Sequence, residues 1–550
     1  MQKKKYLITT PLIEARKQEH NYCYLHTWLL EITDNNEHSI DELLNQIDIY
    51  ECLEKKIKLG LYDLMNIIHK KKKSYNYWDI LLGTWVDHFI MIAIDRWKRI
   101  ETFDDMDFTH VESPKYNYSD LADNTFEIFR ERIQHDYWNS IFYARILDFK
   151  NKCVVEYKDI NEKYKVNYNN SLHFNIFKNQ QKHLFLNTYL GKLDEIYINL
   201  KLGQIPRFKR KFLVPPLYNY KEELRSIKKI FTYENKLEEF ISKNIFIYLP
   251  KSFLEGFEQL DEIIKKENLP KNPKNIYCGI FPNITHILKY LAEKKESGAK
   301  IICGDHGGGV QYYSALKNYL KKHSNIYLTW SKINLKHNEK CIGYIKKRFK
   351  NNRPKNIVLF LFNHSRYIFK PSCHSILFSQ NYIQKIKNFV GNFDENIQEK
   401  ILLRLIGEDF WEQEKIYKKE FPNILFDKAN IKISKVFNSA ELIISTYNST
   451  TIIEGIFNNI PSCLLVDEQE ISKSIVYEKR KYYQLLQDVY ILHTDPNKCA
   501  RFLNQLFEDN TLNSWWNSKK TQNAINLFKE NICPENKNLI QDITNYLKLN

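Results

Sequence analysis

Short runs of β-branched and aromatic residues, bounded by turn residues, alternate along the chain with longer stretches in which apolar residues recur at helical spacing. This alternation is typical of parallel sheets whose strands are joined by crossover helices. We therefore expect an α/β protein with one group of strands before residue 336 and another after residue 355. The expected strands are Tyr6–Thr9, Ile245–Leu249, Ile276–Phe281, Lys300–Cys303, Ile326–Thr329, Ile357–Phe362, Ile401–Leu405, Ile424–Phe426, Leu442–Ser445, Cys463–Val466 and Val489–Leu492.

The stretch between the first two expected strands has the pattern of helix and loop, so residues 38 to about 235 are expected to be a large helical insertion in the first domain. The polar stretch 337–354 has no strand pattern and ends in Asn-Asn-Arg-Pro, which predicts a linker. The expected domains are therefore 1–336, with the insertion, and 355–550. The expected helices of the insertion are Asp41–Leu59, Leu61–Lys70, Trp78–Arg99, Asn124–Tyr143 and Gln180–Asn199.

The chain of 550 residues has 82 Lys and Arg against 66 Asp and Glu, a formal net charge of +16. Such an excess suits nucleic acid, anionic lipid headgroups or an anionic substrate. The sequence has no recognisable nucleic-acid-reading module, and its aromatic residues are not interleaved with the basic runs, so we expect no nucleic-acid partner. An anionic membrane surface stays a candidate partner, which would bring the protein to a lipid-linked acceptor.

Targeting and cysteine patterns indicate the cytoplasm. The lysine-rich start leads into an apolar stretch too short for a signal peptide, and no run approaches the ~20 apolar residues of a membrane span. The ten cysteines form no CxxC pair, so we expect neither a disulfide framework nor structural zinc. We expect a cytoplasmic protein, with peripheral binding to the inner face of the cytoplasmic membrane as a further option.

Glycine gives the sharpest local signal, because four of the chain's 15 glycines fall within residues 304–309, Gly-Asp-His-Gly-Gly-Gly. The segment follows an apolar strand and precedes a helical run, where backbone N–H groups can approach an anion. A tight turn alone would need fewer glycines. Neither GxGxxG nor GxxxxGK(S/T) is present, which argues against a dinucleotide site and a P-loop. We name Gly307, Gly308 and Gly309 as candidate substrate-binding residues.

Asp305 and His306 stand beside these glycines and are candidate catalytic residues. An imidazole with an ordinary pKa of ~6.5 suits removal of a proton from an attacking hydroxyl group. Asp305 either orients the histidine or acts in its place, and a structural cap is the alternative for His306. Thr10 and Glu14 follow the first strand, so we expect Thr10 to contact substrate and Glu14 to be a further candidate base.

The second signal lies between residues 441 and 461, where we expect a strand, a short turn and a helix capped by Asn448. Hydroxyl and free N–H groups of the first helical turn would converge at the positive end of the helix dipole, which favours a phosphate. Glu454 lies on the same face as Thr450 and would accept hydrogen bonds from a ribose diol. An ordinary capped helix is the alternative. The candidate substrate-binding residues here are Ser445, Asn448, Ser449, Thr450, Thr451 and Glu454.

Four further residues are candidates for substrate binding. Arg404 ends an apolar strand where an unpaired guanidinium is costly, so it binds a carboxylate or phosphate or forms a structural ion pair. Arg366, just past another strand, is a weaker candidate of the same kind. His69 and Trp78 belong to a polar and aromatic cluster suited to a sugar, with core packing as the alternative because Trp78 and Trp85 fall at helical spacing.

Three stretches together resemble a family of transferases encoded in bacterial surface-polysaccharide clusters. They are the Thr9-Thr10 loop, the Asn-Ile-Ile-His, Tyr-Trp, Gly-Thr-Trp and Asp-Arg motifs between Asn66 and Arg96, and the half from His306-Gly-Gly-Gly through Ser445-Thr-Tyr-Asn-Ser-Thr-Thr to Trp515-Trp516. The resemblance implies a GT-B-like fold, in which two Rossmann-like domains face a cleft. The first would bind the acceptor and the second the nucleotide sugar.

The same resemblance implies a reaction. Near relatives of the family transfer nonulosonic acids, such as pseudaminic acid, from CMP-activated donors into capsule or lipopolysaccharide. The implied partners are a nucleotide sugar and an oligosaccharide or lipid-linked glycan acceptor, and no cofactor or metal is implied. The histidine-glycine loop and hydroxyl-rich helix start are also similar to those of CDP-glycerol-type phosphotransferases, which is the alternative. Asp305 before the histidine departs from the family pattern, so Asp305 and His306 both stay candidates.

Overall fold

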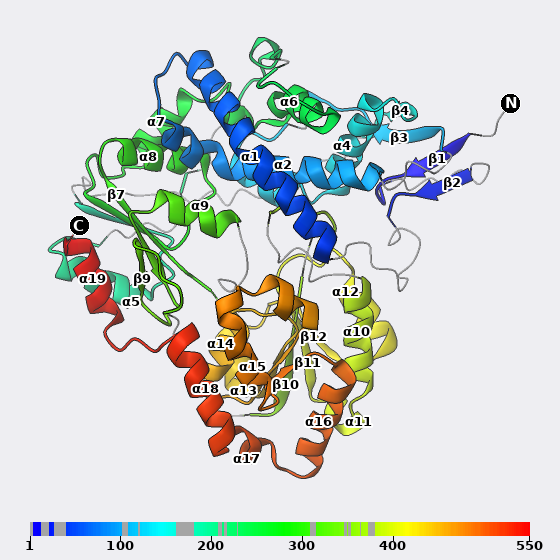
Figure 1. Cartoon of the computed structure of the whole chain (residues 1–550), viewed down its shortest axis with the longest axis vertical. Helices are drawn as coiled ribbons and strands as arrows, with labels where there is room; N and C mark the ends of the chain where they lie inside the picture. Colours follow the sequence, from blue (N-terminus) through cyan, green and yellow to red (C-terminus); the bar gives the residue numbers. More distant parts are fainter. Residues whose placement is uncertain are drawn as a thin grey trace.

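Three sheets of parallel strands organise the part of the chain that the structure describes (Figure 1). Two of them, each covered by helices, confirm the expected α/β, GT-B-like class. The third accompanies the N-terminal helices. The computed structural model describes residues 4–12, 21–26, 40–101, 108–118, 121–160, 181–206, 212–213, 217–227, 229–307, 315–345, 349, 354–363, 365–371 and 380–549.

The first sheet has five parallel strands in the order β5-β6-β7-β8-β9. Ile276 and Cys278 of β6 pack in one core cluster, whereas Tyr277 packs in another, so both faces of the sheet are buried. The strands are β5 His183–Leu186, β6 Asn275–Cys278, β7 Lys300–Gly304, β8 Ile326–Thr329 and β9 Glu339–Cys341. The helices of this unit are α5 Lys192–Lys201, α7 Gln259–Lys266, α8 Thr285–Glu296 and α9 Ala315–His323.

The second sheet has six parallel strands in the order β12-β11-β10-β13-β14-β15. Alternate residues of β10 again enter two clusters, with Leu359 in one and Val358 in the other. Its strands are β10 Asn356–Leu361, β11 Ile401–Leu405, β12 Leu425–Asp427, β13 Ala440–Ser445, β14 Ser462–Leu465 and β15 Leu492–His493. Its helices are α10 Gln380–Gly391, α11 Glu395–Gln398, α12 Gln413–Glu420, α13 Ile433–Ser439, α14 Thr450–Phe457, α15 Arg480–Gln487, α16 Pro496–Glu508, α17 Leu512–Trp516 and α18 Lys519–Ile532.

A third sheet corrects the expected place of the first strand. β1 (Lys5–Ile8) pairs with β2 (Asn21–Tyr24) and β3 (His110–Pro114), and β3 pairs with β4 (Val154–Lys158). The strand expected at 6–9 therefore belongs to this sheet and not to the first one. The helices of this region are α1 Ile40–Ile68, α2 Tyr75–Glu101, α3 Thr125–Glu127, α4 Asp136–Phe149 and α6 Lys236–Tyr248.

The strand expected at Ile245–Leu249 is wrong, because most of this segment is the end of helix α6. Asn235 caps the helix by accepting a hydrogen bond from the Glu238 N–H at 2.9 Å, and the Glu238 carboxylate accepts one from the Glu234 N–H at 2.9 Å. Apolar residues at three- and four-residue spacing then form a buried face. Helical periodicity thus overrides the β propensity of the aromatic and β-branched run.

Two strands of the first sheet lie in segments where none was expected. β5 falls within the predicted insertion, at a place predicted to be helical, and forms an edge of the first sheet. β9 falls within the predicted linker 337–354 and forms the other edge. The first sheet therefore runs in sequence from His183 to Cys341.

Helix α1 is continuous where two helices were expected. Gly60 lies inside it, and a Cβ atom there would lie 2.5 Å from the carbonyl oxygen of Ile230. Glycine therefore permits the close approach of another segment, and it does not end the helix.

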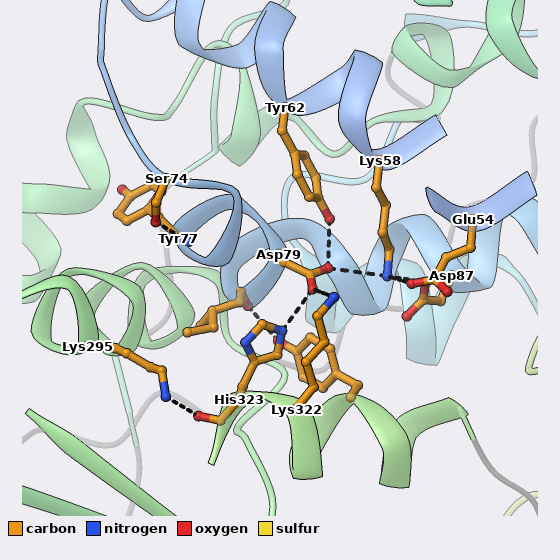
Figure 2. A network of polar contacts seen from close by, with 12 residues as sticks. Glu54, Lys58, Tyr62, Ser74, Tyr77, Asp79, Asp87, Lys295, Lys322 and His323 are labelled. Carbon is orange, nitrogen blue, oxygen red and sulfur yellow. Dashed lines mark hydrogen bonds and ion pairs between the residues drawn. The ribbon is translucent and has the colours of Figure 1, made fainter. Parts of the chain in front are cut away.

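A buried carboxylate, Asp79 of α2, joins the N-terminal helices to α9 of the first sheet (Figure 2). It accepts hydrogen bonds from Tyr62 at 3.0 Å, Lys322 at 2.7 Å and His323 at 2.9 Å. Burial alone would raise the pKa of Asp79, but the bond from His323 and the nearby lysine charges hold it well below its usual range. The network fixes α2 against α9.

Lys58 of α1 enters the same network and is 1% exposed (Figure 2). Its ammonium group lies 2.6 Å from Glu54, 2.6 Å from Asp87 and 3.2 Å from Asp79. Burial alone would lower the pKa of Lys58, but these carboxylates raise it well above its usual value. The cation is thus compensated within the fold.

The C-terminal end of the described chain returns to the first sheet, where Figure 1 shows α19 (Leu539–Leu549) beside α5 and β9. The Asn275 side chain of β6 donates a hydrogen bond to the Leu547 carbonyl at 2.7 Å. Ile543 and Leu547 pack in the same core cluster as Tyr277. The first unit is therefore completed by residues that follow the second unit in sequence.

Helix α2, with 27 residues, is long and apolar enough to cross a membrane by length and composition, and no other helix among the described residues meets that test. Of its most apolar window, 89% is buried inside the molecule. A core helix passes the same test, so this is weak evidence for a membrane span.

Candidate functional site

The loop after β7 and the start of α14 are in contact. β7 ends at Gly304 and β13 at Ser445, and the two motifs singled out in the sequence follow these carboxyl ends. A Cβ atom built on Gly307 would lie 2.6 Å from Oγ1 of Thr450, so a larger side chain would displace the threonine. The structure thus brings together the glycine loop and the hydroxyl-rich helix start that were singled out in the sequence. The other two candidate glycines, Gly308 and Gly309, lie outside the described residues.

The cap of α14 is Ser449 and not Asn448, which corrects the expected capping residue. The Ser449 hydroxyl accepts a hydrogen bond from the Thr451 N–H at 3.2 Å. The Asn448 side chain instead donates to the Tyr483 hydroxyl of α15 at 2.7 Å. Asn448 therefore fixes α15 beside the start of α14.

The polar side chains at the start of α14 differ in how accessible they are to a ligand. Ser445 is fully buried, and its hydroxyl donates to the Tyr447 carbonyl at 2.7 Å. Ser449 and Thr451 are also buried. Thr450 and Glu454 are half-buried. Of the candidates on α14, these two are the ones best placed to contact a ligand.

Asp305 is a buried carboxylate directly after β7, 2% exposed. It accepts hydrogen bonds from the Tyr327 hydroxyl at 2.6 Å, the Thr329 hydroxyl at 2.7 Å and the Trp330 N–H at 3.1 Å. Burial alone would raise the pKa of Asp305, but Lys317 at 3.9 Å and these hydrogen bonds hold it below its usual range. A carboxylate this well satisfied suits holding the loop better than removing a proton.

His306 is half-buried, and its ring stacks on Tyr189 with centroids 4.7 Å apart and planes 17° apart. Tyr189 follows β5 with a φ of +58°. A Cβ atom on Gly279, after β6, would lie 2.7 Å from the Tyr189 ring. The loops after β5, β6 and β7 therefore pack together at one edge of the sheet. Sequence reasoning missed Tyr189 because it missed β5, whose signal is the apolar run His183–Leu186 before a turn.

Two lysines lie near Asp305, two residues before Gly307. Lys317 of α9 and Lys479, at the end of the 3-10 helix η9 (Tyr477–Lys479), both act electrostatically on Asp305 or on each other. No motif in the sequence distinguishes these lysines, and only the fold places them here. Within the described ranges, no group of three or more His, Cys, Asp or Glu side chains is arranged to hold a metal ion.

Arg404 forms an ion pair inside the second sheet. It is 4% exposed on β11, and its guanidinium contacts the Asp427 carboxylate of the neighbouring β12. The two residues are register partners across the strand pair. The structure therefore favours the structural ion pair over donor binding, because the counter-charge of Arg404 is already present.

Arg366 and Thr10 lie elsewhere. Arg366 pairs with Asp136 of α4 at 3.0 Å, and the hydroxyl of Tyr367 donates to the same carboxylate at 2.6 Å, which docks the segment after β10 on the N-terminal helices. Thr10 is 1% exposed after β1, in the third sheet, which Figure 1 shows on the right, away from β7 and α14. Glu14 lies outside the described residues.

His69 and Trp78 are packing residues, which corrects their placement at a sugar site. Trp78 is fully buried and its indole N–H donates to Asn66 at 3.0 Å. His69 stacks on Phe257 with centroids 4.0 Å apart and lies 2.8 Å from the Phe253 carbonyl. Burial lowers the pKa of His69 to about 4, so its ring is neutral at pH 7.

Comparison with solved structures finds matches at low similarity, of which three follow. MurG of Acinetobacter baumannii is 11% identical with a TM-score of 0.31, covering 55% of this chain and 80% of that one. WaaG, a glycosyltransferase involved in lipopolysaccharide biosynthesis, is 10% identical with a TM-score of 0.31, covering 66% and 99%. The wall teichoic acid polymerase TagF is 12% identical with a TM-score of 0.28, covering 53% and 84%. TM-scores this low carry no argument about function.

Comparison with curated proteins finds no match. A family model, by contrast, matches residues 2–547. This range includes all three sheets, the glycine loop and the start of α14. The chain therefore belongs to the LIC12162 family of transferases.

Proposed function

We propose that this transferase moves a nonulosonic acid, such as pseudaminic acid, from a CMP-activated donor to a surface-polysaccharide acceptor. The observation that carries the proposal is the contact between Gly307 and Thr450, which sets a helix start of the second unit against the glycine loop of the first. A nucleotide phosphate bound there meets free N–H groups at the positive end of the α14 dipole. The resemblance of these motifs to CMP-nonulosonate transferases supports the choice of donor.

Each residue at the contact has a role in this proposal. Thr450 binds the phosphate, and Glu454, one turn later on the same face, accepts hydrogen bonds from the ribose diol. His306 removes the proton of the acceptor hydroxyl group. The acceptor oxygen then bonds to the anomeric carbon, the bond from that carbon to the phosphate oxygen breaks, and CMP leaves. Asp305 holds the loop in place.

Thermal shift with CMP, CDP, UDP, GDP and ADP tests the nucleotide. We expect selective stabilisation by CMP, and we expect Glu454→Gln to lose most of it because the ribose contact is removed. Glu468→Gln, an exposed carboxylate of the same unit, is the matched control and should leave the shift unchanged. A preference for UDP, or full CMP binding by Glu454→Gln, contradicts the proposal.

Mass spectrometry of reactions with CMP-pseudaminate and candidate glycan acceptors tests the transfer. An acceptor that gains the sugar alone, with release of CMP, supports a glycosyltransferase. A product from a CDP-alcohol that retains the donor's phosphate would instead indicate a phosphotransferase of the CDP-glycerol type.

A further inference from the structure

Lys479 is a buried cation where the two larger units meet. The residue is 6% exposed and ends the short helix η9. Among the described residues, its ammonium group has no carboxylate within 4.0 Å and no hydrogen-bond partner. Burial, the larger cause, and repulsion from Lys317, the second, together lower the pKa of Lys479 to about 8.

The position of η9 links it to both sides of the Gly307–Thr450 contact. The carboxylate of Glu478 accepts a hydrogen bond from Asn334, in the loop after β8 of the first unit, at 2.9 Å. Four residues after Lys479, Tyr483 holds Asn448 directly before the cap of α14. Lys479 thus ends an element that contacts the first unit, and α15, which follows directly, borders the helix start of the second.

The carboxylates near Lys479 already have partners. Lys479 interacts electrostatically with Lys317 and Lys321 of α9 and with Asp305 and Glu339. Glu339 pairs with Lys321 at 2.6 Å. Asp305 has three hydrogen-bond donors and Lys317 at 3.9 Å. The two carboxylates that act on Lys479 are therefore already held by other groups, and neither forms an ion pair with it.

We propose that Lys479 binds the phosphate group of the donor beside the start of α14, so that the ligand supplies the missing negative charge. A buried cation without a counter-charge is costly, and a phosphate at this place is stabilised by both the ammonium group and the helix dipole. The identity of the nucleotide in this inference rests on the proposed function. The binding of a phosphoryl group by Lys479 does not. Because Lys317 comes from the first unit and Lys479 from the second, the phosphate draws on both units.

The experiment measures affinities by calorimetry for CMP, cytidine and inorganic pyrophosphate, with wild type, Lys479→Met, Lys479→Arg and Lys481→Met. Lys481 is exposed two residues away and is the matched control. We expect Lys479→Met to bind CMP and pyrophosphate at least about tenfold more weakly, with cytidine unchanged. Lys479→Arg should keep most of the affinity because the charge is retained. Without ligand, Lys479→Met should melt at or above the wild-type temperature, since it removes an unpaired buried charge.

The outcomes separate this inference from the proposed function. If the wild type binds pyrophosphate but not CMP, and Lys479→Met loses pyrophosphate, the phosphate site stands and the choice of nucleotide fails. If Lys479→Met binds CMP and pyrophosphate as tightly as the wild type, the inference is overturned and the proposed function stands. A wild type that binds neither compound overturns both.

Discussion

Lys58 and Lys479 are both buried cations, but they differ in whether the chain supplies carboxylates beside them. Lys58 is surrounded by three carboxylates within 3.2 Å, and its pKa is raised well above the usual value. Lys479 has no such partner among the described residues, and its pKa falls to about 8. A cation whose counter-charges belong to the chain joins helices together. A cation without them, placed where two units meet, is suited to an anion from outside.

The largest expected effect tests the network around Lys58, whose charge is compensated by carboxylates of the chain. Asp79→Ala removes a shared partner of Lys58, Lys322 and His323, so we expect the free energy of unfolding to fall by about 3–5 kcal/mol. Urea denaturation followed by tryptophan fluorescence measures it. Glu54→Gln is the control, since Glu54 is 30% exposed and Lys58 keeps its other partners; the expected loss there is below about 1 kcal/mol. Equal losses for the two variants would show that the network is not held by Asp79.

Arg404 extends the comparison to the second sheet. Arg404→Met leaves Asp427 buried without its cation, so we expect a loss of about 3 kcal/mol in unfolding free energy. Calorimetric CMP affinity should stay within about twofold of wild type. This is the reverse of Lys479→Met, which should keep its stability and lose affinity. A large loss of CMP affinity with an unchanged free energy of unfolding would instead indicate that Arg404 binds the donor.

Gly307→Ala tests the contact on which the proposed function depends. The added Cβ would lie 2.6 Å from the Thr450 hydroxyl, and we expect CMP affinity to fall about fivefold, ~1 kcal/mol. Thr450→Ala removes the obstructing oxygen, so the double variant should lose less than the two single losses combined. Gly391→Ala is the control, because a Cβ there has room at 3.8 Å. Additive losses would mean that the two residues do not meet.

The smallest expected effect is a pH dependence. Between pH 8 and its ordinary value of 10.5, Lys479 is deprotonated in the folded protein but still protonated in the unfolded chain. The contribution of Lys479 to the free energy of unfolding therefore rises as the pH rises from about 8 to 10.5, because the unfolded state binds more protons than the folded state. The melting temperature of Lys479→Met should exceed that of wild type at pH 7, and the gap should close towards pH 10.5. The flanking groups Lys317, Lys321, Asp305 and Glu339 are common to both proteins, and a constant gap would contradict the assignment.

Sequence patterns located most strands of the two larger sheets, because buried parallel strands are short apolar runs bounded by turns. β8 and β11 have the expected bounds. β2 and β4 were missed because they are half-exposed and short. At the site, Gly307 and Thr450 carry local signals, which are glycine density and hydroxyls at a helix start. Lys479 carries none, since burial and a missing partner arise only when distant segments pack.

The return of α19 to the first sheet affects how the protein is made. While the ribosome is still adding the second sheet, the hydrogen bond from Asn275 to Leu547 and the packing of Ile543 are absent. The core of the first sheet is then incomplete. The first unit therefore completes its folding only after the second unit, which is synthesised later, has folded. A stop codon just before Leu539 would therefore damage the half of the molecule that was translated earlier.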